Sequence, residues 1–280
     1  MTSRLRRMRE PLYEEKEAQA IGNTENLASK LLLEVAMGPQ DTAQSQLAKA
    51  RPWARQLWEE LVDRPQSRWG YPVFLEPGYE QMEEYISRRD VVLTQAREAA
   101  YCEETLGARW NLQTLDWPIA AKDNNWTLEY KFSVMREVFQ SITENTPKKQ
   151  RLSHEKEVRS GGLDDGILPN VFLVIDRGSI DTVMAVMGNV EDMWVWAVDV
   201  DFDTRFQPAE LATEQIPEEY RGYMRVSLQQ LVNNFFEQRY LYAEDKPLAC
   251  LWAAAAQSKN RAFVSLDESK PGFRWRHRVP

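Results

Sequence analysis

Four acids with the spacing of metal ligands follow an apolar segment, 193–198. They are Asp199, Asp201, Asp203 and Glu210. Their offsets match the first, third, fifth and twelfth positions of a calcium-binding loop, in which hard oxygen ligands surround the ion. A divalent-metal site in this loop is therefore one hypothesis, and no other cofactor is expected.

The same segment also fits a solvated acidic loop that binds no ion. Thr204 stands where a calcium loop needs a glycine for its sharp turn, and Pro208 restricts the backbone further. Between positions 191 and 219, nine acids stand against one base, Arg205. Such an excess of one charge is typical of a solvent-exposed segment. Both interpretations of the acids stay open.

A second set of candidates combines tryptophan with arginine. Its members are Arg68, Trp69, Arg109, Trp110, Trp194 and Trp196. The rings could line an apolar ligand pocket in which the guanidinium groups anchor a polar substituent. Ten tryptophans in 280 residues are equally consistent with aromatic packing in the core, where each indole N–H needs an acceptor.

Nucleophilic and nucleotide chemistry find little support. The two histidines, His154 and His277, stand in charged segments, whereas a histidine that activates a serine or cysteine needs a fixed position. Neither a GxGxxG motif nor a P-loop motif is present, so the common phosphate-binding loops are not expected.

Charge and cysteine content limit the compartment and the partners. The net charge of −8 argues against a nucleic-acid-binding protein, because neutralising phosphates needs a basic surface. Cys102 and Cys250 are too few for a disulfide scaffold. No signal-peptide core and no membrane-spanning stretch is recognisable in the sequence. We expect a soluble cytoplasmic protein, with the nucleus as the alternative, and neither nucleic acid nor membrane as partner.

Hydrophobic periodicity predicts an α+β fold, in which a small mixed sheet of about four strands packs with amphipathic helices. Strands are expected at 69–75, 171–175, 193–198 and 262–266. Helices are expected from Arg51 to Arg64, between Gly78 and Gly107, over 129–143, after Ser227 and over 248–256. Pro72 favours an edge position or a strand start, and Ser227 with Gln230 predicts a capping box.

The region 171–198 has the most definite pattern. A continuous apolar run, 171–175, is followed by apolar residues at helical spacing from Ile180 to Met187, and then by the alternating segment 193–198. Strand, short helix and strand in this order indicate a compact βαβ crossover unit, which is almost always right-handed.

The domain organisation follows from changes in composition. We expect a single α+β domain over 51–267, preceded by a partly flexible helical arm, 1–50, and followed by a basic tail, 268–280. Within the domain, the segment 145–166 mixes charges and lacks periodicity, which predicts a mobile linker.

Several segments also carry a resemblance. They are RWGY at 68–71, RWNLQTLDWP at 109–118, DG at 165–166 with NVFLVID at 170–176, MWVWAVD at 193–199, and YRGY at 220–223 with QQLVNNF at 229–235. Over about Arg51 to Leu266 the chain resembles an uncharacterised family of proteins common in filamentous fungi. The resemblance implies a fungal cytoplasmic protein and carries over no activity.

The candidates favour a non-catalytic binding or protein-interaction protein, with a protein or a small molecule as partner. The alternative is an enzyme acting on a small organic molecule, for example in fungal secondary metabolism. In that case Asp199, Asp201 and Asp203 would be metal ligands or acid–base groups. Convergence of these carboxylates on an apolar pocket would favour the enzyme.

Overall fold

The computed structural model describes residues 45–78, 83–122, 126–144, 162–185, 189–202, 220–258 and 260–266. The chain divides into two compact units, Met1–Lys49 and Ala50–Pro280. The sheet, the helices and the cavities described below belong to the second unit.

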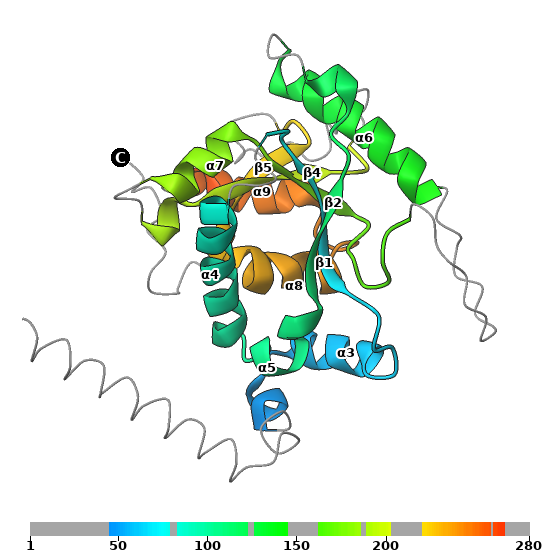
Figure 1. Cartoon of the computed structure of the whole chain (residues 1–280), viewed down its shortest axis with the longest axis vertical. Helices are drawn as coiled ribbons and strands as arrows, with labels where there is room; N and C mark the ends of the chain where they lie inside the picture. Colours follow the sequence, from blue (N-terminus) through cyan, green and yellow to red (C-terminus); the bar gives the residue numbers. More distant parts are fainter. Residues whose placement is uncertain are drawn as a thin grey trace, which may run out of the picture. The chain divides into compact units, whose positions relative to one another are not determined.

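A six-stranded mixed sheet forms the centre of this unit (Figure 1). Its strands are β1 (Trp69–Leu75), β2 (Trp110–Leu115), β3 (Val171–Ile175), β4 (Trp194–Asp199), β5 (Tyr223–Ser227) and β6 (Ala262–Phe263). They lie in the order β2-β1-β3-β4-β5-β6. β1 runs parallel to both β2 and β3, β4 is antiparallel to both β3 and β5, and β6 is parallel to β5.

Helices cover both faces of the sheet. They are α3 (Pro52–Leu61), α4 (Glu83–Ala99), α5 (Glu103–Leu106), α6 (Leu128–Glu144), α7 (Arg177–Met184), α8 (Phe236–Leu241) and α9 (Leu248–Gln257). On one face, α6 buries Phe132, Met135 and Phe139 in a core that includes Phe172 of β3. The other helices contribute to a larger core on the opposite face. Figure 1 shows α6 apart from α4 and α8, with the strands between them.

The larger core is built on aromatic rings. Trp53, Trp69, Tyr71 and Phe236 are fully buried and contact one another at ring-centre distances of 4.9 to 5.8 Å. The Trp69 indole N–H donates to Leu106 O at 2.8 Å, so this buried ring satisfies its polar atom. Much of the tryptophan content is therefore core packing.

The predicted strands are found, but two further strands escape the pattern. β1 and β3 have the predicted bounds, β4 is shifted by one residue, and β6 covers the first two residues of 262–266. β2 and β5 were not expected, because each carries polar residues in the middle. We predicted about four strands, and the described residues form six.

The predicted βαβ crossover at 171–198 is wrong in its geometry. Strand, helix and strand follow in the expected order, but β3 and β4 are antiparallel neighbours, with Val171 opposite Asp199 and Val174 opposite Trp196. The alternation of side chains in β4 is the same whichever way the strand runs. Periodicity therefore located the strand and could not give its direction.

Two local predictions also fail. Pro72 was expected at an edge or a strand start, yet β1 is an inner strand; the ladder to β3 begins at Val73, one residue after the proline. Ser227 ends β5 and makes no capping bond. The helix after it begins with a 3₁₀ turn and a π-helical turn, Leu231–Phe235, before α8. A capping box occurs instead at the start of α7, between Asp176 and Ser179.

Most of the predicted mobile linker, 145–161, lies outside the described residues, as do the arm up to position 44 and the tail 268–280. The closing part of the linker is described. Leu163 is buried in the smaller core, and Gln113 bonds the backbone on both sides of it, donating to Gly162 O and accepting from Asp164 N–H, both at 3.0 Å. None of the described helices is long and apolar enough to cross a membrane.

Candidate functional site

The predicted aromatic set does not form one pocket. Trp69 and Trp110 pack in the larger core, whereas Trp194 and Trp196 belong to the core on the other face of the sheet. The sheet itself therefore separates the two pairs.

The two arginines beside Trp69 and Trp110 bind backbone carbonyls. Arg68 Nη1 donates to Ala108 O at 2.9 Å, and Arg109 Nη1 donates to Leu61 O at 2.5 Å. Arg109 also lies over the Trp58 ring, 5.7 Å from its centre. Both guanidinium groups tie local segments together, which gives them a structural role.

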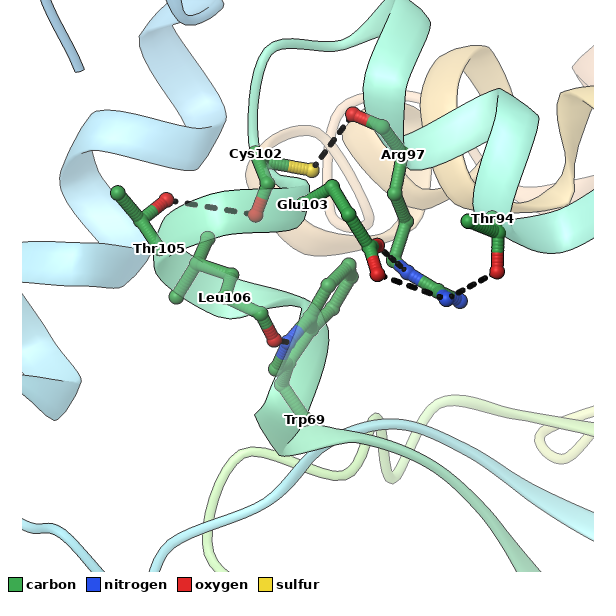
Figure 2. Close-up of polar contacts among 7 residues, drawn as sticks. All are labelled: Trp69, Thr94, Arg97, Cys102, Glu103, Thr105 and Leu106. Carbon is green, nitrogen blue, oxygen red and sulfur yellow. Dashed lines mark hydrogen bonds and ion pairs between the residues drawn. The ribbon is translucent and has the colours of Figure 1, made fainter. Parts of the chain in front are cut away.

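The surroundings of Trp69 contain a polar network (Figure 2). Arg97 is ion-paired with Glu103 and donates to Thr94 Oγ1 at 2.9 Å. Cys102 lies beside this pair and is fully buried, and burial raises the pKa of its thiol to about 12. A thiol that stays protonated is a poor nucleophile, so this network is an internal brace between α4 and α5.

The acidic candidates do not form one cluster among the described residues. Asp199 accepts from the Tyr220 hydroxyl at 3.1 Å and from Asp201 N–H at 3.2 Å. Asp201 is exposed, and Asp203 and Glu210 lie outside the described residues. In the part of the chain that is described, no group of three or more His, Cys, Asp or Glu residues could hold a metal ion.

Asp199 belongs to a buried network that joins elements of both faces. Burial raises the pKa of its carboxyl group, and the hydrogen bond from Tyr220 opposes the rise. Arg136 of α6 donates to Asp199 O at 2.8 Å and to Gly222 O at 2.9 Å. Arg239 of α8 also acts on Asp199 electrostatically, and burial lowers the pKa of both guanidinium groups. The hydrogen bonds of Arg136 fix the end of β4 against α6.

The other tryptophan pair contacts an arginine, and Trp196 of this pair lines a cavity. In the β4–β5 ladder, Trp196 is opposite Arg225, so their side chains share a face of the sheet. The Arg225 guanidinium lies 4.2 Å from the centre of the Trp194 ring and 5.1 Å from that of Trp196. At such distances an arginine is attracted to the electron-rich faces of the rings.

Three arginines and three aromatic residues line this cavity of about 460 Å³, which we name the Arg225 pocket. They are Arg221, Arg225, Arg261, Trp196, Tyr223 and Trp252, together with Met224 and Ala256. Strand β5 supplies Tyr223 and Arg225, and α9 supplies Trp252. Among the lining residues there is no acid.

Arg225 is the least compensated charge in the pocket. Its guanidinium group makes no hydrogen bond or ion pair with a described residue, and burial lowers its pKa. The negative charge of Asp176 opposes this lowering of the Arg225 pKa. The two oxygens of Asp176, however, already accept hydrogen bonds from Ser179 N–H and from the Trp196 indole N–H, both at 2.9 Å. A half-buried guanidinium without a bonded carboxylate is typical of a site for an anion.

At the rim, Arg221 and Tyr223 share one acceptor. Arg221 Nη1 lies 2.8 Å from Glu129 Oε1 of α6, and the Tyr223 hydroxyl donates to the same oxygen at 2.7 Å. The bonds from Tyr223 and then Arg221 lower the pKa of Glu129 to about 2. Glu129 therefore holds two of the pocket's residues in place through an ionised carboxylate.

Two other cavities have mixed charge. One, of about 440 Å³, lies where β1 and β3 end and is lined by Glu76, Lys131, Asp176 and Arg177 among others. The second, of about 490 Å³, is lined by Asp90 with Arg89 and Arg97 and by Trp110. Neither set of side chains favours one sign of ligand charge, whereas the Arg225 pocket does.

The sequence reasoning missed Arg221, Tyr223 and Arg225. Their two-residue period, with apolar Met224 and Val226 between and after them, is the signal that could have found them. It predicts a strand with one apolar face and one face of arginine and tyrosine. Of the two candidates Trp194 and Trp196, Trp196 lines this cavity, and the arginine beside both rings is on the next strand.

Comparison of the chain with protein-family models, with curated proteins and with solved structures finds no match in any of the three.

Proposed function

We propose that this protein is a binding protein for a small organic anion that carries a planar ring, and that the Arg225 pocket is its binding site. The observation that carries the proposal is the half-buried Arg225 guanidinium, which lies over the Trp194 and Trp196 rings and has no bonded carboxylate among the described residues.

Contact with two aromatic rings prepares this guanidinium for an anion. The Trp194 and Trp196 rings lie at 71° to each other, 4.2 and 5.1 Å from the guanidinium carbon, so they support the group without using its hydrogen-bond donors. Arginine is weakly hydrated and presents paired donors that match the oxygens of a carboxylate or phosphate. A ligand that binds here therefore meets a donor whose position is already fixed, which reduces the entropy lost on binding.

The other walls suit a planar ring. Tyr223 and Trp252 line the cavity with Trp196, and aromatic side chains bind flat apolar groups through stacked or edge-to-face contacts. A volume of about 460 Å³ is in the range of small-molecule sites. The pocket therefore combines a polar anchor with apolar walls.

The local charge contrasts with the charge of the whole chain. The protein has a formal net charge of −8, yet the pocket is lined by three arginines, of which Arg221 is ion-paired with Glu129, and by no acid. A confined cationic pocket on an acidic protein selects a small anion, because an extended polyanion such as nucleic acid would be repelled by the rest of the chain.

Isothermal titration calorimetry on the full chain tests the proposal. The probe is 1-naphthyl phosphate, with 1-naphthol as the uncharged ring and inorganic phosphate as the anion without a ring. We expect 1-naphthyl phosphate to bind saturably. Each of the two partial probes, 1-naphthol and inorganic phosphate, should bind about tenfold or more weakly than 1-naphthyl phosphate.

Substitutions at Arg225 locate the site. Arg225→Ala should weaken binding of 1-naphthyl phosphate by about tenfold to a hundredfold, because a charge-assisted hydrogen bond is lost. Arg225→Lys should lose less affinity for 1-naphthyl phosphate than Arg225→Ala does, since the positive charge remains. The matched control is Arg55→Ala, an exposed arginine on α3, which should bind as the wild type does. Absence of saturable binding, or equal affinities for Arg225→Ala and Arg55→Ala, would overturn the proposal.

A further inference from the structure

Strand β2 is an unprotected edge of the sheet. It stands at one end of the strand order, and its ladder with β1 runs from Trp110 to Phe74's partner Leu115 without a bulge. Its sequence, WNLQTL, contains no charged residue and no proline. Proteins commonly protect a sheet edge with such residues, with a bulge or by keeping the edge strand short. β6, at the other end of the sheet, has two residues, whereas β2 has six and none of these protections.

Alternate residues of β2 direct their backbone groups away from the sheet. A Cβ atom at Gly70 of β1 would lie 2.0 Å from Asn111 O, so the carbonyl group of Asn111 points toward β1. Successive residues of a strand direct their N–H and C=O groups to opposite sides, so those of Trp110, Leu112 and Thr114 point outward. Trp110 N–H donates to Gly107 O. The other outward groups have no hydrogen-bond partner among the described residues.

These groups are complementary to a second copy of the same strand. In an antiparallel pair centred on Leu112, the N–H and C=O of Leu112 bond those of Leu112 in the second copy, and Thr114 N–H reaches Trp110 O. Side chains that face each other then match in type, because leucine meets leucine, Asn111 meets Gln113 and Trp110 meets Thr114. Such cross-strand pairs stabilise a sheet. A pairing centred on Gln113 would instead place Asn111 against Leu115.

The charges at the two ends of β2 favour the antiparallel orientation. Arg109 directly precedes the strand, and Asp116 directly follows it. Asp116 is exposed and forms no ion pair with a described residue. Antiparallel pairing brings the start of one strand beside the end of the other, so Arg109 of each copy lies near Asp116 of the second copy. Opposite charges at both ends therefore help to fix the orientation.

We infer that β2 is a self-association surface, at which two copies of the protein pair antiparallel strands centred on Leu112 and join their sheets into one. Pairing at a sheet edge buries little surface, which is typical of weak interfaces, so we expect a dissociation constant of about 1 to 100 μM. The inference is independent of the proposed function, because no residue of β2 lines the Arg225 pocket.

Sedimentation velocity on the full chain, from about 1 to 300 μM, tests the association. We expect the wild type to change from monomer to dimer over this range. Thr114→Pro removes an outward N–H group and leaves the ladder to β1 intact, so it should weaken the dimer by about tenfold or more. Thr114→Val is the matched control, since it keeps the N–H group and should dimerise as the wild type does. The melting temperatures of the monomers should agree within a few degrees, which shows that both variants fold.

A cysteine cross-link tests the register without depending on that variant. Cys250 is exposed and Cys102 is buried, so Cys250→Ser supplies the background. In the proposed pair the two copies of Leu112 face each other with Cα atoms about 5.5 Å apart, which suits a disulfide. The two copies of Thr114 stand roughly 13 Å apart, which is too far. Under mild oxidation Leu112→Cys should form a covalent dimer on a non-reducing gel, and Thr114→Cys should not.

Three results would overturn the inference. A wild type that stays monomeric at the highest concentration shows that the edge does not self-associate. A dimer that Thr114→Pro leaves as tight as Thr114→Val does is formed by another surface. Equal cross-linking of Leu112→Cys and Thr114→Cys rules out the pairing centred on Leu112. Arg225→Ala should dimerise as the wild type does, so failure of the anion site and failure of this inference are seen separately.

Discussion

Trp196 holds the Arg225 pocket together through two different contacts. Its ring lies 5.1 Å from the Arg225 guanidinium, and its indole N–H donates to Asp176 Oδ2 at 2.9 Å. The second contact occupies the carboxylate of Asp176, whose negative charge raises the pKa of Arg225. Trp196 therefore both supports the cation and engages the acid that would otherwise compete for it.

We predict that Trp196→Phe lowers the free energy of unfolding by about 2 kcal/mol, because a hydrogen bond to a charged group is lost and the smaller ring leaves a gap. It should also weaken 1-naphthyl phosphate binding, since Asp176 is then available to Arg225. Urea denaturation and calorimetry measure the two effects. Trp126→Phe is the control: Trp126 is 47% exposed, and its change should stay within about 0.5 kcal/mol. Equal effects of the two substitutions would contradict this role of Trp196.

Glu129 makes the rim of the pocket sensitive to acid. Bonds from Tyr223 and Arg221 lower its pKa from the ordinary 4.5 to about 2. The native state therefore favours the ionised form, so its contribution to stability is fully present above pH 4.5 and is lost as the pH falls toward 2. Because the side chain is 43% exposed, solvent screening limits this contribution to below about 1 kcal/mol.

Thermal unfolding of Glu129→Gln between pH 7 and pH 2 checks this. The wild type should melt at the higher temperature above pH 4.5, and the difference should shrink and disappear as the pH approaches 2. Glu98→Gln, an exposed acid on α4, serves as the control and should show no such trend. A difference that stays constant across this range would show that the carboxylate charge is not what stabilises the rim.

Asp199 should show the opposite dependence on pH. Burial raises its pKa above the ordinary 3.8, so the unfolded chain releases this proton at a lower pH than the native state does. Stability is therefore lost as the pH rises from 3.8 through the raised value. We expect Asp199→Asn to be more stable than the wild type at pH 7 and similar to it below pH 3.8, as measured by urea denaturation.

Asp201→Asn is the matched control for this change, because Asp201 is exposed, and it should alter stability by less than about 0.5 kcal/mol. A destabilised Asp199→Asn at pH 7 would mean that attraction to Arg239 and Arg136 outweighs the burial of the carboxylate.

Gly70 allows β1 and β2 to approach closely. Its φ is 139°, and a Cβ atom at this position would lie 2.0 Å from Asn111 O. Gly70→Ala must therefore move the backbone of β2 or break the ladder, and we expect a loss of about 3 kcal/mol or more in the free energy of unfolding. Gly78 has φ 95°, and no atom lies within 4 Å of the carbon that an alanine would add there. Gly78→Ala should therefore lower the free energy of unfolding by about 1 kcal/mol from backbone strain alone. Urea denaturation compares the two, and equal losses would show that the contact with Asn111 is not what demands glycine.

The parts of the fold that could be predicted are those in which local pattern and burial agree. β3 is buried along its whole length, and its continuous apolar run gave the strand bounds directly. α6 likewise shows the helical spacing of a face that packs on the sheet. In both elements the residues that decide the structure are neighbours in the chain.

The pocket could be predicted only in part, because its contacts join residues that are distant in the chain. Trp194 and Trp196 were candidates because of their residue type, but the arginine that contacts both rings is in β5, and its place follows from the antiparallel register. In the same way, Trp69 and Trp110 stand together because β1 and β2 are paired. Composition indicated aromatic packing and could not say on which face of the sheet each ring lies.

The ladder between β1 and β3 has a consequence for how the chain reaches its native state. It joins Val73 to Leu173, about 100 positions along the chain, and closing a loop of that length slows folding. During synthesis, β1 has to wait for β3 with one hydrogen-bonding edge unpaired. We therefore expect slow refolding in vitro and a tendency of nascent or truncated chains to associate through β1, because an open strand edge pairs readily with another chain.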